Sequence, residues 1–265
     1  MVSNGQLKRN LRKQQLNRAL SYLPAFTPCS PYKIYHINRF TTTLLLHDLI
    51  LLARETTLFT VDTETDYYSH QAALIQIEFI QQQHSSIVLL IEINHLDDTT
   101  SVSYWMIRSL LKIIFNDSNV ILSWGDLKDE LEKFIPCGLF SYEIVQQINN
   151  IDIQEYFKNW HDTRLYHEDA VVFFHDIELA HAYSIKSLEN MNHKWSLQMA
   201  IVYRFQQFLN KNRTNSDWER CLDVNNSQKM YKVNRKEKKI MMEMIEYAAN
   251  DCLAVTKLAK AFNLF

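Results

Sequence analysis

Apolar residues along the chain either alternate with polar ones or gather in short runs, and both patterns predict an α/β fold. Strands are predicted over 32–37, 58–66, 72–80, 86–93 and 120–124, and a further strand leads into a helix from residue 151. Helices are predicted over 41–55, 103–115, 197–209 and 237–264. The strands at 58–66, 72–80 and 86–93 form an antiparallel meander. The order of the elements therefore indicates a mixed sheet of five to six strands flanked by helices.

Two carboxylates lie near the end of the strand predicted over 58–66. Asp62 and Glu64 are spaced i, i+2, so in a strand both side chains point to the same face. Burying two like charges without a partner is costly, and a divalent cation removes that cost, because magnesium and manganese prefer oxygen ligands. The alternative is an exposed acidic turn after a strand, which is the commoner explanation of an isolated D-x-E.

Composition narrows the class of protein. The net charge of −2 means that any affinity for nucleic acid must come from local patches. The three glycines are too few for a glycine-rich phosphate loop. No apolar run approaches the ~20 residues of a membrane-spanning helix. The four cysteines include no C-x-x-C pair, which predicts reduced thiols in an intracellular protein and argues against a zinc site.

A third carboxylate follows the strand predicted over 120–124. Gly125 stands where the chain turns from strand into helix, and Asp126 comes next. Asp126 has two interpretations: the N-cap of the following helix, or a carboxylate at the carboxyl end of a sheet strand, where open sheets bind their ligands. Asp129 and Glu130 are rival candidates one turn on, and their positions are more typical of a solvent-facing helix surface.

Two later segments carry further candidates. Tyr247 and Asp251 are spaced i, i+4 in the last predicted helix and so lie one turn apart on one face; the alternative is a tyrosine that merely caps a neighbouring aspartate. Lys211, Arg213 and Trp218 combine cations with an aromatic ring, the combination that grips a single nucleic-acid strand. The alternative for this segment is a polar loop with Trp218 folded inward, and the sequence leaves both open.

The first 31 residues differ from the rest in charge. Their cations precede the first acidic residue, Asp48. We expect a basic N-terminal extension over 1–31, with a domain boundary near Pro31. Such a segment suits a solvated tail, a nucleic-acid arm or a targeting sequence. The expected location is nuclear or cytoplasmic, and the acid-free start also fits a mitochondrial presequence.

The order of these motifs resembles a known family. D-x-E on a strand, G-D-L-x-x-x-L after a second strand and Y-x-x-x-D on a late helix resemble the three exonuclease motifs of the DEDDy 3′–5′ exonucleases. These belong to the ribonuclease H-like superfamily, with ribonuclease D and the Werner-syndrome exonuclease domain. Residues 151–154 and 208–218 also resemble family segments, and 247–251 nearly match its third motif. The resemblance implies a ribonuclease H-like fold and a 3′–5′ exonuclease domain over 32–265.

The resemblance also implies a role for each site residue. Asp62 would bridge two Mg²⁺ or Mn²⁺ ions, Glu64 and Asp251 would complete the site near the attacking water, and Asp126 would hold the second ion through water. Tyr247 would orient that water or help to deprotonate it. Physical chemistry agrees, because two cations ~3.5–4 Å apart can generate hydroxide and relieve charge on the leaving 3′-oxygen. The partner would be a single-stranded 3′ end of RNA or DNA.

The chain departs from the family pattern in one respect. The stretch between Asp126 and Tyr247 is longer than the family leads us to expect, which predicts an insertion near 158–195. The competing hypothesis is a catalytically silent exonuclease fold that binds RNA or a protein partner. Such relatives typically lose one or more carboxylates, whereas this chain keeps all four and the tyrosine.

Overall fold

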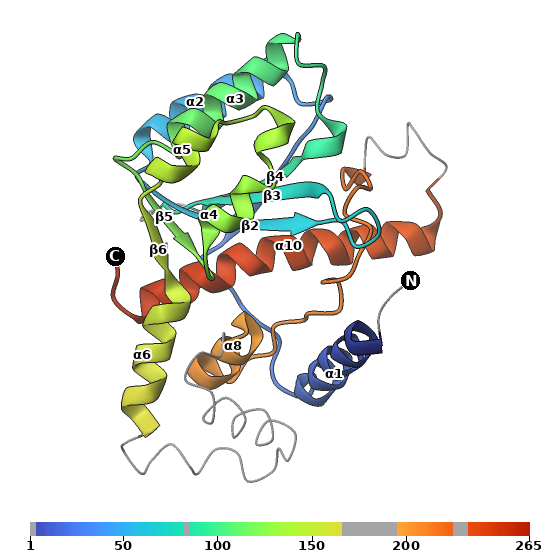
Figure 1. The fold of residues 1–265 in the computed structure, drawn as a ribbon, viewed down its shortest axis with the longest axis vertical. Helices are drawn as coiled ribbons and strands as arrows, with labels where there is room; N and C mark the ends of the chain where they lie inside the picture. The colour runs from blue at the N-terminus through green and yellow to red at the C-terminus, as the bar shows by residue number, and fades with distance from the viewer. Residues whose placement is uncertain (1–3, 82–84, 166–194, 225–232) are drawn as a thin grey trace. The chain divides into compact units, whose positions relative to one another are not determined.

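The computed structural model describes residues 4–81, 85–165, 195–224 and 233–265 (Figure 1). The chain divides into two compact units. The smaller unit contains residues 1–27 and 154–214, and the larger contains 28–153 and 215–265. No helix among the described residues is both long and apolar enough to cross a membrane.

The larger unit is built on a six-stranded mixed sheet in the order β1-β4-β3-β2-β5-β6. Its strands are β1 (Tyr32–Ile37), β2 (Leu58–Thr65), β3 (Ala72–Phe79), β4 (Ser86–Glu92), β5 (Val120–Ser123) and β6 (Asn150–Asp152). Strands β2, β3 and β4 pair antiparallel, whereas β1 with β4, β2 with β5 and β5 with β6 pair in parallel. The predicted α/β class, the mixed sheet and the antiparallel meander are confirmed.

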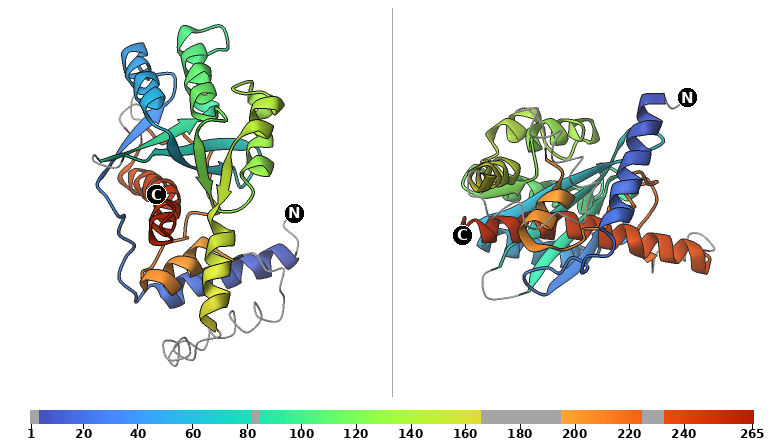
Figure 2. Two further views of the ribbon diagram at one scale, coloured as in Figure 1. Left: turned by 90° about the vertical axis from the view of Figure 1, so that its left-hand side faces the viewer. Right: turned by 90° about the horizontal axis from the view of Figure 1, so that it is seen from below.

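Helices cover both faces of this sheet, which is why every residue of β3 is buried. Four helices lie over one face: α2 (Thr43–Glu55), α3 (Val102–Ile114), α4 (Leu127–Glu132) and α5 (Tyr142–Gln147). The long helix α10 (Arg235–Ala261) crosses the opposite face and contacts β2, β3, β4 and β5 (Figure 2). The 3₁₀ turn η1 (Ile93–His95) lies between β4 and α3, and η2 (Ile135–Cys137) lies between α4 and α5.

Strand β2 directs apolar and polar side chains to different faces. Val61 belongs to the apolar core beneath α2 and α3. Thr60 hydrogen-bonds through its hydroxyl to Thr256 on α10, at 2.7 Å. Because successive side chains of a strand alternate, Asp62 and Glu64 lie on the same face as Thr60, toward α10. The strand thereby places both acidic side chains at the layer formed by the last helix.

Helix α10 begins at a capping box and runs without interruption. The Asn234 side chain accepts from the Glu237 backbone N–H at 3.0 Å, and the Glu237 carboxylate accepts from the Asn234 N–H at 2.9 Å. The helix contains neither glycine nor proline, so its 27 residues form a single element. It starts two residues before the predicted start and ends at Ala261.

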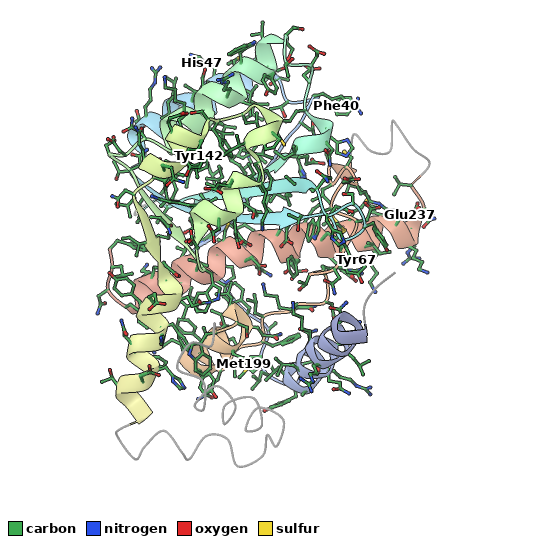
Figure 3. The ribbon with its side chains drawn as sticks, viewed as in Figure 1. Phe40, His47, Tyr67, Tyr142, Met199 and Glu237 are labelled. Atoms are coloured by element: carbon green, nitrogen blue, oxygen red, sulfur yellow. The ribbon has the colours of Figure 1, made fainter. Side chains whose placement is uncertain are left out.

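The smaller unit contains α1 (Asn4–Leu20), most of α6 (Ile153–Leu165) and α8 (Leu197–Phe205). Leu16 and Leu20 of α1 pack against Met199 and Val202 of α8. Figure 3 labels Met199 on this helix. Helix α8 ends earlier than predicted, because Gln206 adopts a left-handed conformation with φ of 54°. Most of the insertion predicted near 158–195 lies outside the described residues.

Candidate active site

Three carboxylates come together between β2 and α10. One oxygen from each of Asp62, Glu64 and Asp251 lies within 4.8 Å of the other two. Glu64 is 9% exposed and Asp251 is 4% exposed, while Asp62 is half-buried. At an effective dielectric constant of about 20, two like charges at this separation repel by roughly 3.5 kcal/mol. The structure therefore places three of the four predicted carboxylates where a cation would relieve considerable repulsion.

The neutral thiol of Cys252 lies close to the three carboxylates. Cys252 follows Asp251 on α10, is fully buried, and places its sulfur 3.9 Å from the Thr60 carbonyl oxygen. Burial, with the nearby Asp62 and Glu78 carboxylates, raises the pKa of the Cys252 thiol well above its ordinary value. This thiol is therefore neutral near pH 7 and adds no charge to the three carboxylates.

Tyr247 lies one helical turn before Asp251, and its ring is buried against Trp218. The two ring centroids are 5.6 Å apart with planes tilted by 48°. Trp218 is 2% exposed, and its indole N–H has no hydrogen-bond partner among the described residues. Of the two arrangements that the sequence left open, the structure shows the inward one. Trp218 supports Tyr247 here, and no face of its ring is exposed for a base.

The segment that carries Trp218 is tied to the turn after β2 by Asp66. The Asp66 Oδ1 accepts from the backbone N–H groups of Tyr68 (2.7 Å) and Ser69 (2.8 Å), and Oδ2 accepts from that of Glu219 (3.4 Å). Burial alone would raise the pKa of Asp66, but these backbone N–H groups outweigh it and lower the pKa. Asp66 is thus a turn residue outside the carboxylate cluster.

Asp126 lies apart from the three carboxylates. It is exposed, and its Oδ1 caps α4 by accepting from the backbone N–H groups of Lys128 (3.0 Å) and Asp129 (3.3 Å). Gly125 makes the preceding turn with φ of +99°, which disfavours any other residue, and its N–H donates to Asp152 Oδ1 at 2.8 Å. The N-cap interpretation is confirmed, and Asp126 does not join the cluster formed by the described residues.

The rival carboxylates of α4 do not join the cluster either. Asp129 is exposed. Glu130 turns toward β2, where its Oε2 accepts from the Thr63 hydroxyl at 3.3 Å. Thr63 alternates with Asp62 and Glu64, so this contact lies on the opposite face of the strand.

The two predicted cationic contacts belong to the smaller unit. Lys211 and Arg213 are both half-buried, and the backbone N–H of Lys211 donates to the Asn17 Oδ1 at 2.7 Å. The same Asn17 oxygen accepts from Gln198 at 2.8 Å. Asn17 thus fixes the loop that presents the two cations within its own unit.

A second group of polar side chains was not anticipated from the sequence. Glu92, His95 and Cys221 place one potential metal-binding atom each within 4.8 Å of the others. Burial first, and then the Glu92 carboxylate, raise the pKa of the Cys221 thiol to about 12. Spacing could have identified only the pair Glu92 and His95, because Cys221 lies far along the chain and completes no recognised motif.

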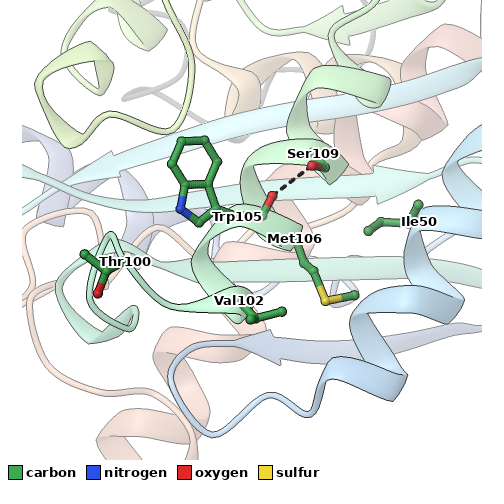
Figure 4. Close-up of a pocket in the computed structure, with 6 residues that line it drawn as sticks. All are labelled: Ile50, Thr100, Val102, Trp105, Met106 and Ser109. Carbon is green, nitrogen blue, oxygen red and sulfur yellow. Dashed lines mark hydrogen bonds between the residues drawn. The ribbon is translucent and has the colours of Figure 1, made fainter.

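A pocket among the described residues lies away from the three carboxylates. Its volume is about 270 Å³, and it is lined by Ile50 of α2, by Thr100, and by Val102, Trp105, Met106 and Ser109 of α3 (Figure 4). These helices cover the face of the sheet opposite to α10. The pocket is largely apolar and contains no carboxylate, so it is separate from the candidate active site.

Comparison with known proteins identifies the fold. No family model and no curated protein sequence matches the chain. The chain shares the α/β fold of a solved exonuclease domain. It is similar to the EXO domain of Aedes aegypti Nibbler, with a TM-score of 0.50 and 11% identity over 86% of each chain. The fold that the motif resemblance implies is thus confirmed.

Two longer structures are also similar. The catalytic core of Trypanosoma brucei RRP6 gives a TM-score of 0.48 at 17% identity and covers 90% of this chain and 48% of that one. Escherichia coli RNase D, an exoribonuclease involved in structured RNA processing, gives a TM-score of 0.47 at 17% identity and covers 88% and 44%. The chain therefore spans about half of the length of these two structures.

Proposed function

We propose that the chain is a metal-dependent 3′–5′ exonuclease that hydrolyses RNA or DNA at the cluster of Asp62, Glu64 and Asp251. The observation that carries this proposal is the convergence of the three carboxylates within 4.8 Å, on an exonuclease fold. All of their ligand atoms are oxygens, and they stand on a strand and a helix packed together. This donor set fits Mg²⁺ or Mn²⁺ rather than a softer metal.

The protein's own contribution is to position groups around the reacting phosphate. Bound magnesium or manganese ions would supply a hydroxide near neutral pH and offset charge on the leaving 3′-oxygen. Asp62, Glu64 and Asp251 would hold these ions, and Asp126 would add a carboxylate through an intervening water. Tyr247 would orient the attacking water, because a phenol with a pKa near ~10 is a weak base and Trp218 fixes its ring.

The substrate would be the 3′ end of a single strand. Lys211 and Arg213, which belong to the smaller unit, are the proposed contacts to phosphate groups of the nucleic acid. Trp218 acts in this scheme by supporting Tyr247.

A catalytically silent nucleic-acid or protein-binding scaffold is the second candidate. It is favoured by the position of Asp126, which caps α4 and stays outside the cluster. A scaffold would have no requirement for a fourth carboxylate at the site. The two functions make opposite predictions about cleavage.

The deciding experiment uses 5′-labelled single-stranded RNA and DNA with Mg²⁺ or Mn²⁺. We expect a ladder of products shortened from the 3′ end, abolished by Asp251→Asn. Glu246→Gln is the matched control, because Glu246 is an exposed carboxylate on the same helix. If the wild-type chain shortens neither substrate, or if Asp251→Asn cleaves as well as Glu246→Gln, the scaffold is the better explanation.

A further inference from the structure

We propose that Glu92, His95 and Cys221 form a zinc site that is distinct from the carboxylate cluster. Glu92 is the last residue of β4, His95 ends the 3₁₀ turn η1, and Cys221 lies three residues after Trp218. Their ligand atoms lie within 4.8 Å of one another. Glu92 and Cys221 are 2% and 3% exposed, while His95 is half-buried and gives access from solvent.

The chemistry of this group selects zinc. One sulfur, one nitrogen and one oxygen are the three donor types that zinc combines, whereas magnesium and calcium avoid sulfur. Bonds of about 2.0–2.3 Å in a tetrahedral arrangement place ligand atoms roughly 3.3–3.7 Å apart. The ligand atoms, which lie within 4.8 Å of one another, therefore need to approach by at most about 1.1–1.5 Å around the ion. A water molecule would complete the tetrahedron.

Two backbone contacts already orient the sulfur and nitrogen donors. His95 Nε2 lies 2.7 Å from the Glu219 carbonyl oxygen, which can only accept, so Nε2 carries the proton and Nδ1 keeps its lone pair. The backbone N–H of Asp223 donates to the Cys221 sulfur. Contacts of this kind fix the tautomer of a metal-binding histidine and stabilise a thiolate.

The oxygen donor is held as firmly. Glu92 Oε1 accepts from the Asn38 side-chain amide at 3.0 Å, and Oε2 accepts from the Leu222 backbone N–H at 2.6 Å. His36 Nδ1 lies 3.2 Å from Oε1. The Cys221 thiol also hydrogen-bonds to the Glu92 carboxylate. Each carboxylate oxygen has two lone pairs, so the one that accepts from the thiol becomes available to a cation when the thiol loses its proton.

Metal binding at this group would replace a proton. As the bond between zinc and sulfur forms, the proton of the Cys221 thiol passes to solvent, and the carboxylate and the neutral imidazole bind without losing one. The ion would also link β4 to the segment 215–222, which packs Trp218 on Tyr247. The existence of this site does not depend on the proposed nuclease activity.

The test measures metal directly on the full chain. We expect about one equivalent of zinc in protein purified with zinc and without chelator, and we expect cobalt(II) to give a near-ultraviolet sulfur-to-cobalt charge-transfer band. Cys221→Ser should abolish the band, and His95→Gln should weaken cobalt binding by about tenfold or more. Cys29→Ser and Cys137→Ser are matched controls and should keep both the band and the affinity.

The charge-transfer band separates this site from the carboxylate cluster, because the three grouped ligand atoms of Asp62, Glu64 and Asp251 are all oxygens. Asp62→Asn should therefore leave the band unchanged. His95→Gln changes a half-buried residue, and its cobalt affinity tests the proposal if Cys221→Ser fails to fold. Absence of both zinc and the band, a band that survives Cys221→Ser, or unchanged cobalt affinity in His95→Gln would each overturn the proposal.

Discussion

A single carboxylate, Glu78, and the cluster of Asp62, Glu64 and Asp251 lie where the sheet meets α10. Their surroundings stabilise different charge states. Glu78 on β3 is fully buried and accepts a hydrogen bond from the Thr256 hydroxyl, which in turn accepts one from Thr60. Burial raises the pKa of Glu78 despite the hydrogen bonds from the Thr256 and Ser86 side chains, which lower it. Asp62, Glu64 and Asp251, by contrast, crowd one another within 4.8 Å.

The difference shows how surroundings separate a structural carboxylate from a functional one. A single buried carboxyl group can be neutralised by a proton and satisfied by hydroxyl groups. Three carboxylates at a half-buried site would need several protons at once, and one multivalent cation replaces all of them. The same residue type therefore lies in the packing between sheet and helix at one position and forms the proposed ion site at the other. This contrast can be tested by substitutions that remove one carboxylate charge at a time.

The largest expected effect is on catalysis. Asp62→Asn should lower the rate of 3′-end shortening by about a thousandfold or more, because it removes a proposed metal ligand. Glu78→Gln keeps the hydrogen bond from Thr256 and should change the rate by less than about threefold. Initial rates at saturating Mg²⁺ measure both. The proposed division of roles fails if the two substitutions have equal effects.

A smaller loss is expected at Asp126, where charge and capping can be separated. Asparagine caps a helix about as well as aspartate, so Asp126→Asn should lower the rate by roughly 10- to 100-fold and leave stability nearly unchanged. Asp126→Ala should lower the rate similarly and also reduce the free energy of unfolding by about 1 kcal/mol. Rates and urea denaturation distinguish the two effects. An unchanged rate in Asp126→Asn would restrict this residue to its capping role.

Removing a charge from the crowded cluster should stabilise the metal-free protein. In EDTA, we expect Asp62→Asn to raise the free energy of unfolding by about 1–2 kcal/mol, because part of the repulsion with Glu64 and Asp251 disappears. Urea denaturation measures this change, with Glu246→Gln as the exposed control. A destabilised Asp62→Asn would show that the three carboxylates do not repel one another appreciably in solution.

The smallest effect concerns the pH dependence that Glu78 causes. Its folded-state pKa is raised above the ordinary value of 4.5, so the folded state binds the proton more tightly than the unfolded state. Its contribution to stability is fully present below pH 4.5 and decreases as pH rises toward the folded-state pKa. Glu78→Gln removes this decrease, so its stability relative to wild type should rise by about 1 kcal/mol between pH 5 and pH 8. A difference that stays constant with pH would contradict a raised pKa.

Local patterns were sufficient to predict most of the sheet and part of the site. The alternation in β2 correctly placed Asp62 and Glu64 on one face, and the i, i+4 spacing placed Tyr247 and Asp251 on one side of α10. These inferences depend only on the geometry of a strand or a helix. Helix α8 was predicted too long, because its end at Gln206 depends on a backbone conformation that hydrophobic periodicity does not encode.

Contacts between distant segments could not be predicted in the same way. Trp218 is buried where its ring packs against that of Tyr247. The two residues lie in different segments of the chain, so their contact depends on the tertiary fold. The group of Glu92, His95 and Cys221 likewise forms only when the segment after Trp218 returns to the end of β4. The spacing of residues within a single element predicts neither the contact of Trp218 with Tyr247 nor the second group.

The position of α10 near the end of the chain determines when the three carboxylates can come together during synthesis and folding. It is attached to β2 through Thr60 and Thr256, which are separated by 196 residues in sequence. Contacts over such distances close large loops and form slowly compared with local ones. During synthesis, β2 with Asp62 and Glu64 is made long before the ribosome reaches Asp251. A nascent chain therefore holds an incomplete set of the proposed metal ligands, and the finished set marks a chain whose last helix has docked.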